Sequence, residues 1–222
     1  MNLTLFDLDG TLLHGDSDHA FGEFLITLGW ADAAAFRRRN DEFFADYQAG
    51  RLDIHRYVDF ATEPWRERPP AALDRARARF MAEVVQPMLK APALQLLRQH
   101  QTAGDQVAIV TATHSFITRP IATALEVQEL IATELVFDAQ AQATGAILGQ
   151  PCFGAGKVKR VHDWLAARGQ TWDSFERCSF YSDSTNDLPL LERVSHPVAT
   201  NPSPALEQVA QQRGWPILKL FT

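Results

Sequence analysis

The sequence predicts an α/β fold, a doubly wound parallel sheet with a helical module inserted after the first strand. Three observations support this prediction. A short apolar run covers residues 2–6, helical periodicity covers residues 17–85, and strand-like and helix-like segments alternate after Pro87. Alternating βα units favour a parallel sheet covered on both faces, with right-handed connections. We therefore expect an α/β core of residues 1–16 and 86–222 and a helical cap of residues 17–85.

The composition is that of a folded, acidic protein. The chain has 222 residues, of which 46% are hydrophobic and 22% charged, enough to bury a core in one domain or two small ones. The net charge of -6 has the wrong sign for binding phosphate backbones, so nucleic acid is not an expected partner. No apolar run approaches the ~20 residues that cross a bilayer, and Asp7 and Asp9 fall where a signal peptide is uncharged. We therefore expect a cytoplasmic protein that does not bind membranes.

The first predicted element is a buried strand over residues 2–6. It stops at Asp7-Leu8-Asp9-Gly10, where glycine gives the chain freedom to turn directly after the acids. The strand therefore brings two carboxylates to its C-terminal end.

The inserted segment, residues 17–85, is predicted to contain four helices. Apolar residues recur there at helical spacing, as at Phe21, Phe24, Leu25 and Leu28. The breaks between the helices are expected at turn-forming residues, namely near Gly29, near Gly50 and around Pro64, Pro69 and Pro70. The segment holds 11 of the 22 aromatic residues, which would give a small helical module a core of its own.

Strands and helices are predicted to alternate after Pro87. The expected helices cover residues 92–101, 115–125, 157–168 and 188–194, and a last helix precedes residues 215–221. The expected strands cover residues 106–111, 178–181 and 197–200, and residues 135–152 are expected to form a hairpin that turns at Thr144-Gly145.

Reactive side chains follow several of these segments at the same edge of the predicted sheet. In open α/β sheets, ligands bind beyond the carboxyl ends of the strands. A cluster of carboxylates there would repel itself unless a cation lay among them, and hard oxygen ligands without His or Cys suit Mg²⁺. The sequence therefore predicts a Mg²⁺ site with one lysine that balances a second anion, formed by Asp7, Asp9, Thr111, Lys157, Asp183 and Asp187.

These residues belong to four motifs that resemble those of the haloacid dehalogenase superfamily in order and spacing. The motifs are Asp7-x-Asp9-Gly-Thr, a hydrophobic strand ending in Thr111, Gly-Lys157, and Asp183-x-x-Asn-Asp. The helical insertion and the hairpin before Lys157 resemble the phosphoserine phosphatase-like branch (subfamily IB, with a helical C1-type cap). That branch also includes enzymes assigned to histidinol phosphate.

The resemblance implies a phosphomonoesterase mechanism. Asp7 would attack phosphorus and form an aspartyl phosphate, while Asp9 would protonate the leaving alcohol and then activate water. Lys157 and Mg²⁺ would offset the charge of the phosphoryl oxygens. The phosphoryl group would also receive hydrogen bonds from Thr111 and from the backbone N–H groups of Leu8, Asp9 and Ala112. The implied metal ligands are Asp7, Asp183 and the main-chain carbonyl of Asp9, with Asn186 and Asp187 holding the ion and its waters.

The substrate implied by the resemblance is a small phosphomonoester with an amino group, such as phosphoserine or histidinol phosphate. Asp16 matches the acidic position that receives the substrate amino group in phosphoserine phosphatases, or it caps the helix that begins near Asp18. The alternatives to a hydrolase acting on phosphoric monoesters are a phosphotransferase and a non-enzymatic phospho-aspartate or phosphate-binding domain. The sequence makes no prediction of the oligomeric state.

Two further features are given structural interpretations. Asp187 is expected to cap the helix that starts at Leu188, in addition to any role in the site. The seven histidines show no ligand spacing and are expected at the surface or in loops.

Overall fold

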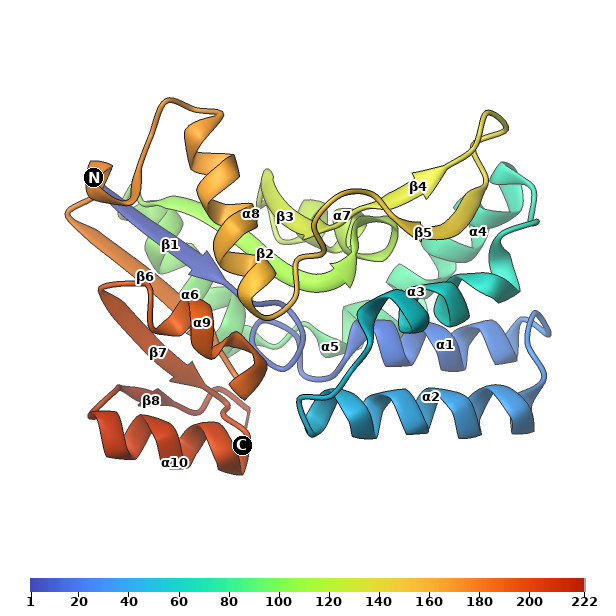
Figure 1. The fold of residues 1–222 in the computed structure, drawn as a ribbon, viewed down its shortest axis with the longest axis horizontal. Coiled ribbons are helices and arrows are strands. Elements are labelled where there is room, and N and C mark those ends of the chain that lie inside the picture. Colours follow the sequence, from blue (N-terminus) through green and yellow to red (C-terminus); the bar gives the residue numbers. More distant parts are fainter. Residues whose placement is uncertain (222) are drawn as a thin grey trace.

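The computed structural model describes residues 1–221 and is built around one parallel six-stranded sheet (Figure 1). The strand order is β3-β2-β1-β6-β7-β8, and every neighbouring pair is parallel. The first strand is therefore central, and the chain continues on both sides of it. The strands are β1 (Asn2–Phe6), β2 (Gln106–His114), β3 (Glu129–Thr133), β6 (Arg177–Ser182), β7 (His196–Thr200) and β8 (Ile217–Leu218).

Helices cover both faces of this sheet, which confirms the doubly wound α/β prediction. Along β1, Leu5 belongs to one apolar cluster and Phe6 to the opposite one, because successive side chains of a strand alternate between faces. The Leu5 cluster includes residues of α8, α9 and α10, whereas the Phe6 cluster includes residues of α6 and α7. These helices are α6 (Ala91–Thr102), α7 (Ser115–Ala124), α8 (Ala155–Ala166), α9 (Leu188–Leu191) and α10 (Pro204–Arg213).

The chain between β1 and β2 contains the four expected helices beside the sheet (Figure 1). The first three begin at Asp16, Asp32 and Asp53, whose carboxylates accept N–H groups of the first turn. The fourth continues through a π-helical turn into a short helix. The elements are α1 (Ser17–Thr27), α2 (Ala33–Gln48), α3 (Ile54–Thr62), α4 (Pro70–Phe80), the π turn (Met81–Val85) and α5 (Gln86–Met88).

The apolar residues of this helical segment join the core of the sheet, which corrects the expectation of a separate core. Trp65 stacks on Phe116 of α7 with ring centroids 4.4 Å apart, and Phe21 meets Phe80 edge-on at 5.0 Å. All four residues are buried in, or packed against, the cluster that contains Phe6 of β1. A helical segment of this size buries more apolar surface by packing against the sheet than its helices would bury by packing only against one another.

The region after β2 differs most from the sequence prediction. Strand β3 was not predicted, and β2 continues three residues beyond Thr111. The expected hairpin is present, but it turns at residues 138–142 rather than at Thr144-Gly145. The reason is that Asp138 Oδ1 accepts two N–H groups within the turn, whereas Gly145 lies inside a strand. The hairpin strands are β4 (Leu135–Phe137) and β5 (Ala143–Ile147).

Two histidines are buried, contrary to the expectation that all seven lie at the surface or in loops. The His100 ring contacts the Asp105 carboxylate at 2.7 Å and the Tyr181 hydroxyl at 2.9 Å. His114 has no hydrogen-bond partner on either ring nitrogen, and burial lowers its pKa to about 4. Both side chains are therefore part of the interior rather than of a solvated face.

No helix within residues 1–221 is long and apolar enough to cross a membrane.

Candidate active site

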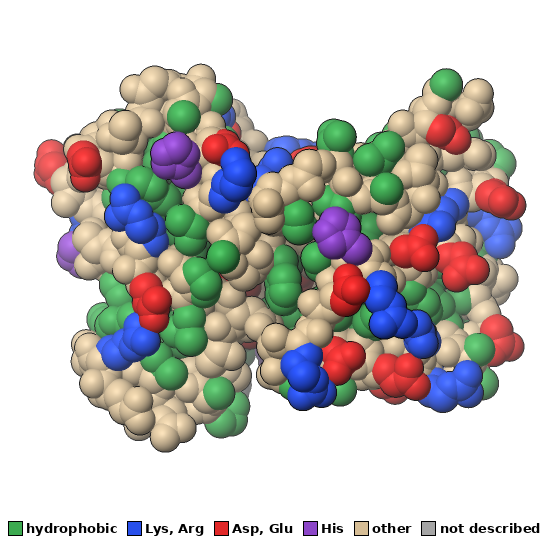
Figure 2. All heavy atoms as spheres, viewed as in Figure 1, with side chains coloured by type: hydrophobic (Ala, Val, Ile, Leu, Met, Phe, Trp, Pro, Cys, Tyr) green, Lys and Arg blue, Asp and Glu red, His purple; other side chains and the backbone are tan. Residues whose placement is uncertain are grey.

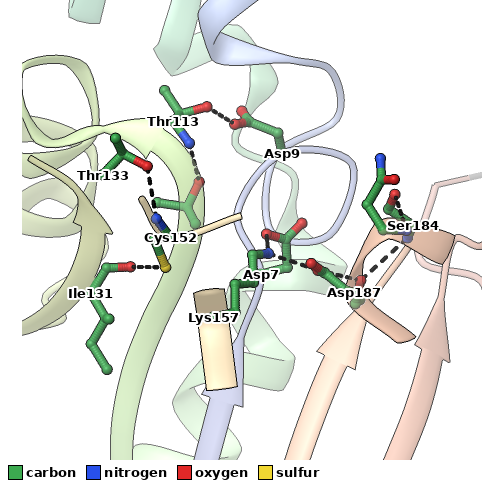
Figure 3. Close-up of polar contacts among 12 residues, drawn as sticks. Asp7, Asp9, Thr113, Ile131, Thr133, Cys152, Lys157, Ser184 and Asp187 are labelled. Carbon is green, nitrogen blue, oxygen red and sulfur yellow. Dashed lines mark hydrogen bonds and ion pairs between the residues drawn. The ribbon is translucent and has the colours of Figure 1, made fainter. Parts of the chain in front are cut away.

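Three predicted residues from distant parts of the chain form a buried ion-pair cluster at the carboxyl edge of the sheet (Figure 3). Asp7 directly follows β1, Lys157 lies in the first turn of α8, and Asp187 ends a 3₁₀ turn after β6. The Lys157 ammonium donates to Asp7 Oδ1 at 2.8 Å and to Asp187 Oδ2 at 2.7 Å. Since all three side chains are buried, one lysine balances two carboxylates in a site of low dielectric constant.

The partners of Asp187 correct one expectation from the sequence. Asp187 occupies the N-cap position of α9, but its carboxylate does not accept an N–H group of that helix. Its Oδ2 atom instead accepts hydrogen bonds from Lys157 and, at 2.7 Å, from the Ser182 hydroxyl. A buried ammonium group needs compensation more than a helix end that water can solvate.

The cluster carries more negative than positive charge. Burial raises the pKa of Asp7 to about 6, although Lys157 acts in the opposite direction. Burial also raises the pKa of Asp183 well above its usual range, and the charges of Asp7 and Asp187 add to that shift. Burial alone would lower the pKa of Lys157, but the two neighbouring carboxylates outweigh it and raise that pKa. The lysine is therefore charged, and the carboxylates remain undercompensated.

Asp9 lies two residues beyond Asp7 and has different partners. Its Oδ1 accepts the Ser17 N–H at the start of α1 at 2.6 Å, and its Oδ2 accepts the Thr113 hydroxyl at 2.9 Å (Figure 3). Burial raises the pKa of Asp9 well above its usual range, and the nearby charge of Asp16 raises it further. The two acids of the first motif are thus an ion-paired carboxylate and a carboxyl group held by neutral donors.

A pocket opens between this edge of the sheet and helices α1 to α3. Asp7, Asp9, Thr111 and Ala112 line its core side. In the space-filling view the surface is hollowed between the two halves of the molecule (Figure 2). Leu8 is fully buried, so only its backbone is suited to meet a ligand. A molecule in this pocket would contact the acids on one side and the helical segment on the other.

Asp16 acts as a helix cap in this structure, and it also borders the pocket. Its Oδ1 accepts the N–H groups of Asp18 and His19 at 3.0 and 2.8 Å. The capping interpretation is therefore confirmed, whereas a contact with substrate stays a prediction. Neighbouring Asp18 lines the same pocket, and its pKa is raised to about 7 by burial and by the charge of Asp16.

The residues around Asp183 fit a hard divalent cation. Asp183 Oδ1 is buried without a hydrogen-bond partner, which is costly for a carboxylate unless a cation meets it. The same side chain packs against the first motif, because a Cβ on Gly10 would lie 2.4 Å from Asp183 Oδ2. The part of the chain that the structure describes contains no group of three or more His, Cys, Asp or Glu side chains arranged for a metal. Two carboxylates would therefore need main-chain carbonyl groups and water as further ligands.

Asn186 is directed toward the helical segment. Its Nδ2 donates to the Tyr47 carbonyl of α2 at 2.9 Å, so this side chain connects the fourth motif to the helices over the pocket. Asp7 and Asp187 each give one oxygen to Lys157, whereas Asp183 Oδ1 has no hydrogen-bond partner, so Asp183 is the carboxylate most open to an ion. The ligand roles of Asn186 and Asp187 stay predictions.

Sequence reasoning missed several pocket residues. Thr113 had a signal, because it lies two positions after Thr111 and so shares its face of β2. Tyr47 belongs to an apolar stripe of α2 that equally suits a core helix. Asp18 and Tyr57 carry no local signal, since only the packing of α1 beside α3 brings them to one pocket.

The comparisons with known proteins agree with this site. The family model for haloacid dehalogenase-like hydrolases matches residues 4–192, which contain all four motifs. The chain belongs to this family. The resemblance inferred from the motifs is thereby confirmed. Relatives named histidinol-phosphatase and phosphoserine phosphatase, 41% and 30% identical, show that the chain is a phosphatase of the family.

Similar proteins cover the whole chain. A histidinol-phosphatase of Neisseria meningitidis serogroup C is 41% identical over 217 residues, which is 98% of each protein. A Bordetella pertussis Tohama I protein of unknown function has a solved structure with a TM-score of 0.93, 45% identity and 99% coverage of both chains. A substrate-bound phosphoserine phosphatase shares the fold at a TM-score of 0.70 and 15% identity, covering 97% of this chain and 91% of its own.

Proposed function

We propose that this protein is a Mg²⁺-dependent phosphatase that hydrolyses histidinol phosphate, or a closely similar amino alcohol phosphate, through an aspartyl phosphate. The observation that carries the reaction is the pair of dissimilar acids, with Asp7 bonded to Lys157 at 2.8 Å and Asp9 held by neutral donors. Support for the substrate comes from the relative named histidinol-phosphatase, which matches over 98% of both lengths, whereas the phosphoserine phosphatase structure is 15% identical.

The reaction uses the two acids in sequence. The Asp7 carboxylate attacks phosphorus, the bond to the leaving oxygen breaks, and Asp9 gives its proton to that oxygen. Asp9 then takes a proton from water as the water oxygen attacks phosphorus, and the bond to Asp7 breaks. The arrangement suits these roles, because Lys157 favours the anionic form of Asp7, and the raised pKa of Asp9 lets it hold a proton.

The phosphoryl group is held at the carboxyl edge of the sheet. Lys157 and the Thr111 hydroxyl would donate to its oxygens, and the backbone N–H groups of Leu8, Asp9 and Ala112 would serve as further donors. Asp7, Asp183 and the Asp9 carbonyl would hold Mg²⁺, with support from Asn186 and Asp187, and the ion would supply charge that offsets the phosphoryl oxygens. The orphaned oxygen of Asp183 favours this assignment.

Residues 17–85 serve as the cap over a core of residues 1–16 and 86–222. Support for this division comes from the pocket, whose walls are the sheet edge on one side and α1 to α3 on the other. The cap excludes bulk water during phosphoryl transfer and contacts the alcohol part of the substrate, where Asp16 faces the amino group.

The test is phosphate release from histidinol phosphate, phosphoserine and p-nitrophenyl phosphate, measured with Mg²⁺ and after EDTA. We expect turnover only with the metal, and loss of turnover in Asp7→Asn. Asp74→Asn, at an exposed position of α4, serves as the matched control and keeps full activity. Turnover in metal-free protein, or in Asp7→Asn at the native rate, would contradict the mechanism. A single burst of alcohol without turnover would favour the non-enzymatic alternative.

A further inference from the structure

The pocket has an unusual charge distribution for a site that receives a phosphate ester. Four carboxylates line it, those of Asp7, Asp9, Asp16 and Asp18. Within the described residues its lining contains no lysine or arginine, and Lys157 contacts Asp7 and Asp187 instead of lining the pocket. Two of the acids, Asp7 and Asp9, belong to the reacting end. The other two lie at the start of α1, where the alcohol half of a bound ester would be.

The walls around the second acidic pair come from the helical segment. Phe43, Phe44 and Tyr47 of α2 line the pocket, and α3 contributes Ile54 and Tyr57. These apolar and aromatic walls lower the local dielectric constant, so a charge in the pocket depends on its partner rather than on water.

Asp18 lies in the first turn of α1 and lines this pocket. Tyr57 of α3 lines the same pocket as Asp18. The charge of Asp18 raises the pKa of Tyr57 well above its usual range, after the effect of burial. Asp16 has one oxygen committed to the N–H groups of α1. Asp18 has no such commitment to its own helix, so its whole carboxylate can meet a ligand charge that Asp16 can meet only with Oδ2.

We propose that Asp18, with the Tyr57 hydroxyl beside it, determines specificity by receiving the ammonium group of the leaving alcohol, and that the same pocket rejects alcohols that carry a carboxylate. This inference rests on the proposed phosphatase function and names the class of substrate as amino alcohol phosphates without a carboxylate. The ammonium group of the substrate would supply positive charge between the carboxylates of Asp16 and Asp18. A substrate carboxylate would instead add a fifth negative charge to a lining that, within the described residues, contains no lysine or arginine and has His19 as its basic side chain.

The decisive substrates are phosphoethanolamine and phosphoserine, which share the ammonium group and differ by one carboxylate. For the native protein we expect kcat/KM to be roughly tenfold or more higher for phosphoethanolamine, because the carboxylate is desolvated without a partner. Histidinol phosphate also lacks the carboxylate and should exceed both. A native protein that prefers phosphoserine to phosphoethanolamine would overturn the proposal.

The variants separate Asp18 from the reacting groups. In Asp18→Asn the ratio of kcat/KM for phosphoethanolamine to that for p-nitrophenyl phosphate should fall roughly 10- to 100-fold, since a charge-assisted hydrogen bond is lost. Tyr57→Phe should move the same ratio in the same direction by a smaller factor. Asp74→Asn, which removes a carboxylate from an exposed position, should leave the ratio unchanged. An unchanged ratio in Asp18→Asn would refute the assignment.

A binding measurement distinguishes failure of this inference from failure of the proposed function. In calorimetry the native protein should bind the alcohol histidinol more tightly than serine, and Asp18→Asn should lose that preference. No phosphate release from any ester, p-nitrophenyl phosphate included, would contradict the proposed function alone. Turnover of p-nitrophenyl phosphate together with equal binding of serine and histidinol would contradict the inference alone.

Discussion

Replacing Lys157 by methionine tests whether the buried ion pairs hold the site together. The substitution keeps the length of the side chain but removes the ammonium group that contacts Asp7 at 2.8 Å and Asp187 at 2.7 Å. Both carboxylates are then buried without a cation, and Asp187 keeps only the Ser182 hydroxyl among the donors described above. Losing one partner of a buried pair destabilises a protein by about 3–5 kcal/mol.

This magnitude corresponds to a fall in melting temperature of roughly 6–20 °C for a protein of this size. The matched control is Lys159→Met, two residues further along α8, where the lysine contacts Asp163 at 2.7 Å on the surface. An exposed pair of that kind contributes roughly 0.5 kcal/mol or less. The two variants therefore carry the same substitution on the same helix and differ mainly in burial.

Urea and thermal unfolding at pH 8, without metal, measure the difference. The loss in Lys157→Met should shrink as the pH falls toward 5, because burial raises the pKa of Asp7 to about 6 even with Lys157 present, so the orphaned Asp7 becomes neutral by protonation. Adding Asp187→Asn to Lys157→Met should restore part of the stability, since one uncompensated charge is removed. Equal stability of Lys157→Met and Lys159→Met at pH 8 would refute the reasoning about buried charge.

Three further predictions concern single residues. Asp9→Asn should lower turnover by roughly 10²- to 10⁴-fold while still allowing some phosphorylation of Asp7, as trapped phosphoprotein in a quenched reaction would reveal. Gly10→Ala should raise the Mg²⁺ concentration needed for half-maximal activity, because its φ is +72° and a Cβ would meet Asp183 Oδ2 at 2.4 Å; an unchanged metal requirement would contradict this. His114→Leu should lose less stability than the native protein between pH 7 and 4.5. The unfolded pKa of 6.5 falls to about 4 on folding, so the contribution of the neutral ring is full above pH 6.5 and is lost toward pH 4. That loss amounts to about 3 kcal/mol, and parallel pH profiles of unfolding free energy would exclude it.

Most of the fold could be predicted because its signals are local. Alternating apolar segments and glycine or proline breaks indicate βα units, and Asp16, Asp32 and Asp53 begin helices as their residue type favours. The hairpin turn was misplaced for a local reason as well. The Asp138 side chain forms the turn through its own hydrogen bonds, whereas Thr144-Gly145 only has the composition of one.

One rule of sheet topology was enough to predict that the site residues lie close together. The carboxyl ends of parallel strands lie at one edge, so Asp7 and the residues after β6 were expected together even though they are far apart in sequence. The structure brings Lys157 and Asp7 into contact across 150 positions of the chain. That contact depends on the order of the strands, which the sequence did not predict, and on a helix that begins close to Lys157, which it did predict.

The partners of each side chain were decided by tertiary structure. The sequence by itself determined which acids reach the edge of the sheet, because strand ends and side-chain alternation depend on neighbouring residues. It did not determine that Asp187 binds Lys157 rather than capping α9, or that Asn186 donates to the Tyr47 carbonyl. Nor could it place Asp18 beside Tyr57 in one pocket. These contacts form only when α1 to α3 pack beside the sheet, since burial then leaves each polar group to the partners that this packing supplies.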